Sequence, residues 1–261
     1  MDVTQAADFL LDHRRRQDIM VDLPPSARPM DLHTAYAVQD AVVAGLITGS
    51  NDATIGYKVA CTNGIAQAAL QIDRPVFGRL LASSTFDSPA SLVASRFTKR
   101  VIEAEFGIRM AASVPIGSGP HTAQTIAAYV GHVLPSVEVV DHRFVDWSVG
   151  ALSVAADNAI HGCWVRGEPF THDWRSLDLA SHKVTVTVDG AFATSGTGAA
   201  VLGHPLNVVA WLANELEAFG RQLKVNDWIT TGVCTDVFEA NAGSEIVADF
   251  GTLGVVEIMW T

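Results

Sequence analysis

The stretch RVIEAEFGIRM, residues 100–110, places two carboxylates two positions apart inside an apolar run. If the stretch is a strand, its side chains alternate between two faces, one of them apolar throughout and the other carrying Glu103, Glu105, Gly107 and Arg109. Residues two apart on a strand lie about 7 Å apart at their bases, so both carboxylates can reach one cation. On a helix the two side chains would diverge. The stretch therefore predicts a strand whose polar face is either solvated or the lining of a charged cavity.

Length and composition predict a globular protein with a large core. The chain has 261 residues, of which 49% are hydrophobic and 17% are charged, and its formal net charge is −11. An acidic chain is a poor binder of nucleic acid. Its one basic run, residues 14–16, is expected on the solvated face of an N-terminal helix.

The cysteines and the N-terminus predict the compartment. Cys61, Cys163 and Cys234 are far apart and form no C-x-x-C pair, which indicates a reducing compartment without disulfides or a zinc site. The N-terminal segment is amphipathic and acidic, unlike a signal peptide, and no stretch is typical of a membrane span. We expect a cytoplasmic protein that binds neither nucleic acid nor a membrane.

The order of local patterns predicts an α+β fold. Residues 1–52 are expected to form an N-terminal helical region of two helices, the second beginning at Asp31 and ending near Gly49. Residues 53–261 are expected to form a β-rich catalytic body. Within it we predict a helix capped by Thr122, carrying hydrophobic residues through 133 and ended by Pro135. We also predict a hairpin that turns at residues 189–190, a helix that opens at residue 205, and C-terminal strands.

A third carboxylate, Glu138, lies in the predicted strand of LPSVEVVDHRF. A glutamate between valines is costly to bury without a partner. It either pairs with Arg109 or Arg143, or joins Glu103 and Glu105 around a hard divalent cation, for which oxygen ligands suit Mg²⁺, Mn²⁺ or Ca²⁺. Asp141 and Arg143 are expected to form an ion pair.

Taken together, several segments resemble one family over nearly the whole chain. They are GYKVACT (56–62), DRPVFG (73–78), EAEFGIRM (103–110), LPSVEVVDHRF (134–144), DNAIHGCWVRG (157–167), VLGHPLNVVAWLANEL (201–216) and TTGVC (230–234). The chain resembles the 2-keto-4-pentenoate hydratase and 4-oxalocrotonate decarboxylase branch of the fumarylacetoacetate hydrolase superfamily. The resemblance implies a mixed β-roll body behind a small N-terminal helical region.

The same resemblance implies the residues of the site. Glu103, Glu105 and Glu138 would hold Mg²⁺ or Mn²⁺, and Lys58 matches the active-site lysine. Substrate binding is assigned to three further residues: Thr231, Gly232 and Arg109.

The resemblance also implies an activity. We expect a hydratase that adds water to a 2-hydroxy-2,4-dienoate, by way of a 2-oxo-enoate, to give a 4-hydroxy-2-oxo acid. The alternatives are a 2-oxo-3-enedioate decarboxylase, an acylpyruvate C–C hydrolase, and an inactive structural partner in a hydratase–decarboxylase complex. A homo-oligomer is expected, with an enzyme of the same pathway as a further candidate partner.

Two positions depart from the hydratase pattern. The motif D-x-P-D-[FY]-G has Val76 at its second acidic position, and valine cannot move a proton. His161 stands where hydratases carry small residues. Histidine titrates near neutrality, so His161 is a candidate catalytic base, the alternative being a structural histidine.

Overall fold

The protein is described by a computed structural model of residues 2–48 and 50–261. The α-helices of these residues are α1 (Val3–Arg16), α2 (Leu32–Ile47), α3 (Gly64–Ala69), α4 (Ala123–Ile126), α5 (Ala151–Ala156) and α6 (Pro205–Ala218). The strands are β1 (Thr54–Ala60), β2 (Val76–Leu81), β3 (Thr85–Asp87), β4 (Ala90–Leu92), β5 (Val101–Met110), β6 (Val130–Val140), β7 (His161–Arg166), β8 (Lys183–Val188), β9 (Ala191–Thr197), β10 (Trp228–Thr230), β11 (Phe238–Glu239), β12 (Glu245–Asp249) and β13 (Val255–Trp260).

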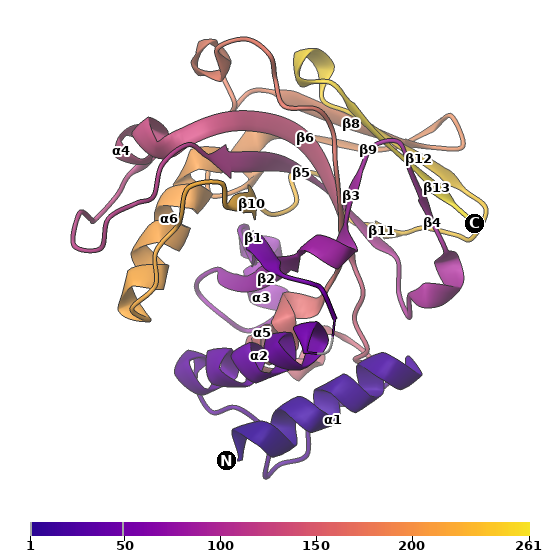
Figure 1. The fold of residues 1–261 in the computed structure, drawn as a ribbon. Helices are drawn as coiled ribbons and strands as arrows, with labels where there is room; N and C mark the ends of the chain where they lie inside the picture. Colours follow the sequence, from indigo (N-terminus) through magenta and orange to yellow (C-terminus); the bar gives the residue numbers. More distant parts are fainter. Residues whose placement is uncertain (1, 49) are drawn as a thin grey trace.

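The two N-terminal helices form as predicted and lie together on one side of the molecule (Figure 1). Asp31 caps α2 by accepting the Thr34 backbone N–H, and the Thr34 hydroxyl completes a capping box. The predicted end near Gly49 falls outside the described residues, and α2 itself ends at Ile47. Buried residues of both helices, such as Leu10 and Tyr36, join the main hydrophobic core, so this region is continuous with the body.

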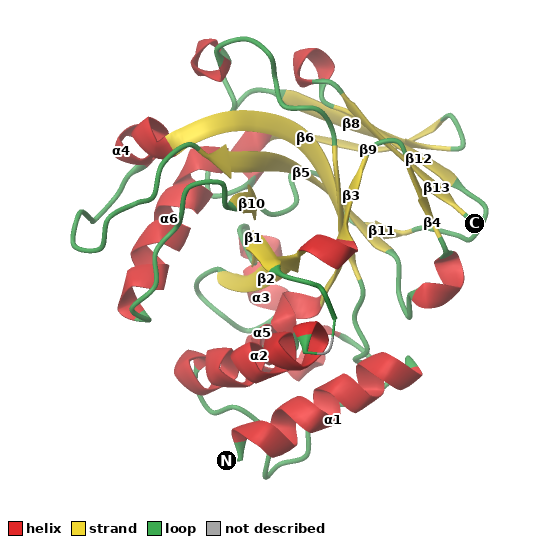
Figure 2. Cartoon of the chain, viewed as in Figure 1, coloured by secondary structure: helices red, strands yellow, loops and turns green. Residues whose placement is uncertain are grey.

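Two mixed sheets form the body (Figure 2). The larger is 8-stranded in the order β2-β1-β10-β5-β6-β7-β3, with β11 also pairing with β5. The smaller is 5-stranded in the order β4-β13-β12-β8-β9. Strands β1 and β10 pair in parallel, whereas β5 and β6 pair antiparallel. The predicted α+β class is confirmed, and the strand that carries Glu103 and Glu105 lies in the interior of a sheet.

The predicted helix from residue 122 to 133 is only partly present. Thr122 caps α4 as expected, but α4 ends at Ile126, and Val130 begins the long strand β6. The hydrophobic spacing of this segment fits a helix, yet from Val130 its backbone pairs with β5 as a strand. Pro135 is accommodated inside β6 because its carbonyl accepts the Gly167 N–H, and Gly167 lies beyond the end of β7. The N–H that proline lacks therefore removes no hydrogen bond between β6 and β7.

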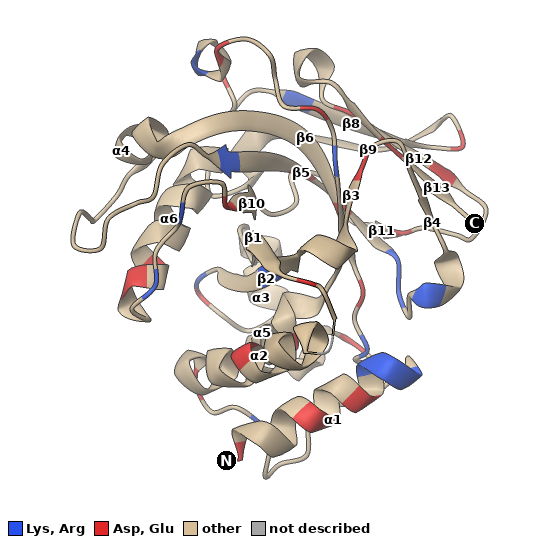
Figure 3. Ribbon diagram, viewed as in Figure 1, with Lys and Arg blue, Asp and Glu red and all other residues tan. Residues whose placement is uncertain are grey.

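The other local predictions are confirmed. Asp189 and Gly190 both have positive φ, 51° and 77°, as a tight turn between β8 and β9 requires. Pro205 is the first residue of α6. Figure 3 shows basic and acidic residues dispersed over the ribbon, with one basic group at the end of α1. Within the described ranges, no helix is both long and apolar enough to cross a membrane.

Candidate active site

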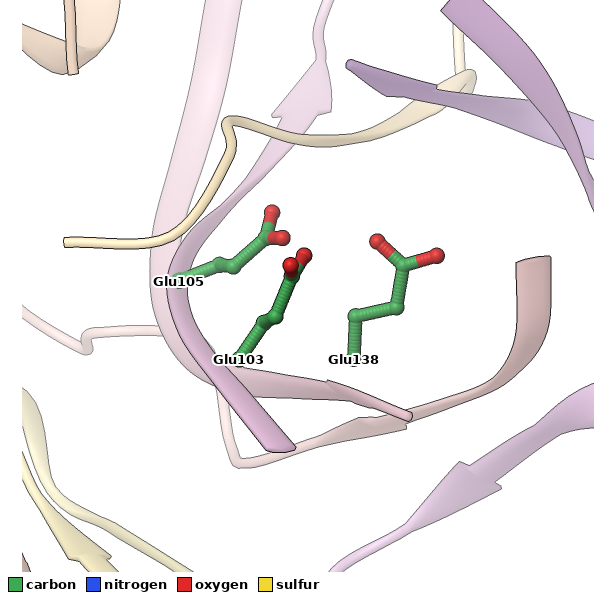
Figure 4. Close-up of side chains that lie close together, drawn as sticks. All are labelled: Glu103, Glu105 and Glu138. Carbon is green, nitrogen blue, oxygen red and sulfur yellow. The ribbon is translucent and has the colours of Figure 1, made fainter. Parts of the chain in front are cut away.

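Three glutamates from two adjacent strands converge on one point (Figure 4). Glu103 and Glu105 extend from β5, and Glu138 extends from β6. One carboxylate oxygen of each lies within 4.8 Å of the corresponding oxygens of the other two. In the β5–β6 register Glu103 lies directly opposite Glu138, and Glu105 lies opposite Ser136. Strand alternation and this register thus place all three carboxylates on the same face.

Burial of the three like charges shifts their protonation. Glu105 and Glu138 are fully buried and Glu103 is half-buried. Burial raises the pKa of Glu103 to about 7, with Glu138 adding to the rise and Lys58 opposing it. Burial, together with the other two carboxylates, raises the pKa of Glu105 well above its ordinary range. The cluster therefore holds protons at neutral pH unless further positive charge is present.

Lys58 of β1 supplies positive charge at Glu138. Its Nζ lies 3.2 Å from Glu138 Oε1 and donates a hydrogen bond to the Ala159 carbonyl oxygen at 3.0 Å. Burial alone would lower the pKa of Lys58, but the three carboxylates outweigh burial and raise it. Burial likewise works to raise the pKa of Glu138, but Lys58 and His161 outweigh it and lower this pKa. Lys58 is therefore an ammonium and Glu138 a carboxylate.

The carboxylate cluster still contains unsatisfied acceptors. Among the described residues, Glu105 Oε1 and Glu138 Oε2 are buried without a hydrogen-bond partner. A buried carboxylate oxygen without a partner is costly, and a divalent cation is a partner that satisfies several such oxygens at once. The cluster offers oxygen donors alone, which is the chemistry of a site for Mg²⁺ or Mn²⁺ rather than for Zn²⁺. These residues fit the metal that the sequence motifs imply.

His161, the first residue of β7, is fixed against Glu138. Its Nδ1 lies 2.8 Å from Glu138 Oε1, and its Nε2 lies 3.3 Å from Ser84 Oγ. Since an ionised carboxylate can only accept, Nδ1 carries the hydrogen of the first bond. The ring is buried, with 2% of its surface exposed. In this position His161 orients a candidate metal ligand, as partners of ligating groups commonly do.

The segment before His161 has an unusual backbone. Asn158, Ala159 and Ile160 all have φ between 47° and 54°, the left-handed region that non-glycine residues avoid. The Asn158 side chain holds the turn by bonding to both the backbone N–H and the carbonyl of Arg79, at 2.7 and 3.0 Å. The turn orients the Ala159 carbonyl toward Lys58 Nζ and places His161 within hydrogen-bond distance of Glu138. Strain of this kind is typical of functional sites.

Arg14 of α1 secures the same segment from outside. Its Nε lies 2.6 Å from Asp157 Oδ1, and its Nη2 donates to the Asp157 carbonyl at 2.7 Å. Arg143 bonds the other oxygen of Asp157 at 2.8 Å and also forms the predicted ion pair with Asp141 at 3.0 Å. The expectation that the basic run is solvated is therefore wrong for Arg14, because its partner is brought to it by tertiary folding.

Thr231 and Gly232 contact the glutamate strand. The Gly232 N–H donates to Glu105 Oε2 at 2.6 Å, and the Thr231 hydroxyl donates to the Phe106 carbonyl at 3.0 Å. Gly232 has a φ of 89°, and a Cβ at this position would lie 2.0 Å from the Thr62 hydroxyl oxygen. In this structure both donors are used within the protein, and they hold Glu105 in place.

Two residues singled out from the sequence have other roles in the structure. Arg109, at the far end of β5, donates to Asn226 Oδ1 at 3.0 Å and lies over the Trp228 ring. Neither it nor Arg143 is the partner of Glu138, whose partners are Lys58 and His161. Val76 is fully buried in the main core, opposite Ala60. The position that is acidic in the hydratase motif therefore contributes only to packing in this chain.

A cavity of about 420 Å³ opens beside the cluster. Lys58 and Glu103 form part of its wall, together with residues of α3, α5 and the segment 233–237. A small molecule in this cavity can therefore reach Lys58 and Glu103, the half-buried member of the carboxylate cluster.

Comparisons with known proteins agree with the motifs. Residues 49–258 match the family model described as fumarylacetoacetate (FAA) hydrolase C-terminal. A 2-hydroxyhexa-2,4-dienoate hydratase of Comamonas testosteroni is 33% identical over 88% of this chain and 89% of its own length. A 4-oxalocrotonate decarboxylase of Pseudomonas putida is 32% identical over 77% of this chain and 75% of its own length.

A solved structure shows the same fold over nearly the whole chain. It is the 4-oxalocrotonate decarboxylase from Pseudomonas putida G7 complexed with magnesium and adipate. The TM-score is 0.92 at 25% sequence identity, with 99% of this chain and 97% of that chain covered. The β-roll architecture expected from the motifs is thereby confirmed.

Proposed function

This chain belongs to the fumarylacetoacetate hydrolase C-terminal family, and we propose that it is a metal-dependent hydratase of 2-hydroxy-2,4-dienoates. The observation that carries the proposal is the buried cluster of Glu103, Glu105 and Glu138 with Lys58 against it, at the wall of a cavity. The net reaction is addition of water. The dienol gains a proton at its terminal carbon to become a 2-oxo-enoate, and water then adds at C4 to give a 4-hydroxy-2-oxo acid.

Mg²⁺ or Mn²⁺ is the proposed cofactor, and Glu103, Glu105 and Glu138 would hold it. When bound, such a cation acts as a Lewis acid for the 2-oxo (or 2-enol) and carboxylate oxygens of the substrate, a contribution of several kcal/mol. The proposal is supported by Glu105 Oε1 and Glu138 Oε2, which find no hydrogen-bond partner in the part of the chain that the structure describes. The solved neighbour complexed with magnesium adds to this support.

Lys58 is the proposed catalytic residue on the cavity wall. The neighbouring carboxylates keep Nζ protonated, so its roles are to attract the anionic substrate and to hold a proton beside it. The Ala159 carbonyl and Glu138 fix the position of Nζ. His161 is proposed to act through Glu138, whose orientation it sets, and not by contact with the substrate.

A decarboxylase is the second candidate, and two observations favour it. The fold match to a 4-oxalocrotonate decarboxylase covers the whole body, and the acidic position that hydratases use is the buried Val76. Decarboxylation of a 2-oxo-3-enedioate needs stabilisation of the enolate but no base for water.

One assay separates the candidates. The purified protein with Mg²⁺ is offered 2-hydroxypenta-2,4-dienoate, a 2-oxo-3-enedioate and an acylpyruvate in turn. Incorporation of water, release of CO₂ and C–C cleavage identify hydratase, decarboxylase and hydrolase respectively. We expect hydration of the dienol to be fastest. Faster CO₂ release would assign the decarboxylase instead, and failure on all three substrates, with an effect on a partner enzyme's rate, would assign a structural role.

We further propose that the chain acts as a cytoplasmic homo-oligomer. The three cysteines are free and buried, which fits a reducing compartment. Ile19, Val21 and Val145 are apolar side chains exposed around the backbone bridge between Met20 and Phe144, as at surfaces that associate. A monomer in light scattering at micromolar concentration would contradict the oligomer.

A further inference from the structure

Beyond Lys58 and Glu103, the cavity beside the glutamate cluster is mostly apolar. Its lining is dominated by aliphatic side chains and one indole, contributed by α3 and the residue after it, by the 233–237 segment and by the body; they include Ile65, Leu70, Trp147, Val154, Ile160 and Val237. A substrate whose carboxylate and 2-oxo group lie at the glutamates must therefore place its other end against hydrocarbon.

In α3 part of this hydrocarbon is exposed to solvent. Its sequence is GIAQAA, yet none of its residues is buried. Ile65 is 83% exposed although it lines the cavity, and Val237, which also lines it, is 49% exposed. Apolar side chains that line one cavity and are exposed to water are stabilised when a ligand removes them from water.

The ionisable groups of the cavity argue against a second charge on the ligand. Among the described residues that line it, Lys58 is the one lysine or arginine, and Glu138 already pairs with it. The remaining acidic group, Asp236, lies at the rim and repels an anion. Burial raises the pKa of Cys61 to about 11, so this thiol is neutral and counts as apolar surface. A distal carboxylate would lose its hydration here without gaining a cationic partner, since the other polar side chains of the lining, Asn63 and Thr235, are neutral.

We propose that the substrate is a monocarboxylic 2-oxo acid, or its dienol, that carries an extended uncharged apolar substituent at the end remote from the carboxylate. The inference rests on the proposed function, because it takes the glutamate cluster as the place of the carboxylate and 2-oxo group. The wall of α3 and the 233–237 segment then sets specificity. At about 420 Å³ the cavity falls within the range of roughly 300–1,000 Å³ that receives drug-sized ligands, so it exceeds the needs of a five-carbon acid.

The first experiment measures binding of substrate analogues that cannot react. Pyruvate, 2-oxobutanoate, 2-oxohexanoate, 2-oxooctanoate and 2-oxoadipate are titrated calorimetrically into the full chain with saturating Mg²⁺. We expect Kd to fall about two- to fourfold for each added methylene. Because 2-oxoadipate differs from 2-oxohexanoate only in carrying a second terminal carboxylate, we expect it to bind at least about tenfold more weakly.

The second experiment changes the wall. Val237→Arg places a cation at the cavity, and we expect it to reduce the preference for 2-oxohexanoate over 2-oxoadipate by about tenfold or more. Val225→Arg is the matched control, because Val225 has the same 49% exposure and does not line the cavity. The control should keep the wild-type preference.

The outcomes separate this inference from the proposed function. If pyruvate binds with Mg²⁺ but Kd is flat with chain length, or 2-oxoadipate binds more tightly than 2-oxohexanoate, the apolar-tail inference is wrong and the proposed function stands. If pyruvate and its homologues fail to bind with or without Mg²⁺, the proposed function fails and the inference fails with it. An equal change of preference in both arginine variants would also overturn the role of Val237.

Discussion

Lys58 and Glu138 form a buried ion pair across two strands, with 3.2 Å between Nζ and Oε1 and at most 1% of either side chain exposed. The pair is embedded among two further carboxylates, so the ammonium offsets more negative charge than that of its direct partner. Removing one member of a buried pair leaves an uncompensated charge, and the remaining member then determines how the protein responds to pH.

Lys58→Met should destabilise the metal-free protein by about 3–5 kcal/mol near neutral pH. Without Lys58, only His161 opposes the effect of burial, and we expect the pKa of Glu138 to rise above its unfolded value. Such a carboxyl contributes stability that is complete below the unfolded pKa and lost as pH rises through the folded pKa. The deficit should therefore be larger at pH 8 than at pH 5 in urea denaturation. Lys183→Met, at an exposed strand position, is the control, and an equal deficit at both pH values would contradict the role of the ion pair.

Glu105→Gln should weaken Mg²⁺ or Mn²⁺ binding by about 10–100-fold or more. It removes the negative charge of a carboxylate whose Oε1 has no hydrogen-bond partner among the described residues. Calorimetric titration measures the effect directly. The rise in unfolding temperature on adding metal should shrink in parallel, since ligand binding stabilises by RT ln(1 + [L]/Kd). Glu257→Gln, on the exposed face of β13, should bind metal as the wild type does. Unchanged affinity in Glu105→Gln would show that the metal site is assigned wrongly.

Metal affinity should rise with pH between about pH 6 and pH 8, because metal and protons compete for the carboxylates. The pKa of Glu103 is raised to about 7 from an ordinary 4.5, so this group is partly protonated at neutrality. Its contribution to the metal-free fold is complete below about pH 4.5 and lost as pH rises through about 7. Calorimetry in two buffers of different ionisation enthalpy should show proton release on metal binding. A Kd for the metal that is independent of pH over this range would contradict the raised pKa of Glu103.

His161→Ala should lower metal affinity by about 10–100-fold, because it releases Glu138 from the bond that orients it. His161→Asn keeps an N–H donor and should recover part of that affinity. His172→Ala, on the exposed surface, is the control. A fall in turnover with unchanged metal affinity would contradict the positioning role and favour His161 as the catalytic base that the sequence suggested.

Ala159→Gly should cost about 1–2 kcal/mol less stability than Ala155→Gly. Both alanines are fully buried, but Ala155 is helical in α5 whereas Ala159 has a φ of 47°. Glycine relieves the steric cost of a left-handed backbone and loses helix propensity elsewhere. Chemical denaturation of the two variants gives the difference directly. Equal losses would mean that the turn before His161 is not strained.

The parts of the fold with local causes could be predicted from the sequence. The two-residue alternation of RVIEAEFGIRM is a property of one strand, and the turn at Asp189-Gly190 needs only its own two residues. The hydrophobic spacing of the segment after Thr122 predicts a helix, of which only α4 forms. Pairing with β5 decides otherwise, and that pairing depends on residues far away in the chain.

The site divides in the same way. The three glutamates and Lys58 could be singled out from motifs, and the structure brings them together. That Glu138 pairs with Lys58 could not be predicted, because β10 and β5 separate β1 from β6 in the sheet and no sequence rule brings the two side chains together. The left-handed turn at residues 158–160 has no glycine to mark it. Arg14 belongs to a basic run with the pattern of a solvated surface, and only the folded chain gives it Asp157.

The β5–β6 register has a consequence for how the chain can misfold. A slip of one residue would send Glu103 to the opposite face of the sheet from Glu138, and the carboxylates would no longer converge. A chain paired in the wrong register would thus lack the metal site altogether. Metal present during refolding should then bind and stabilise only the correctly paired chains, and so increase the yield of the native register over slipped forms.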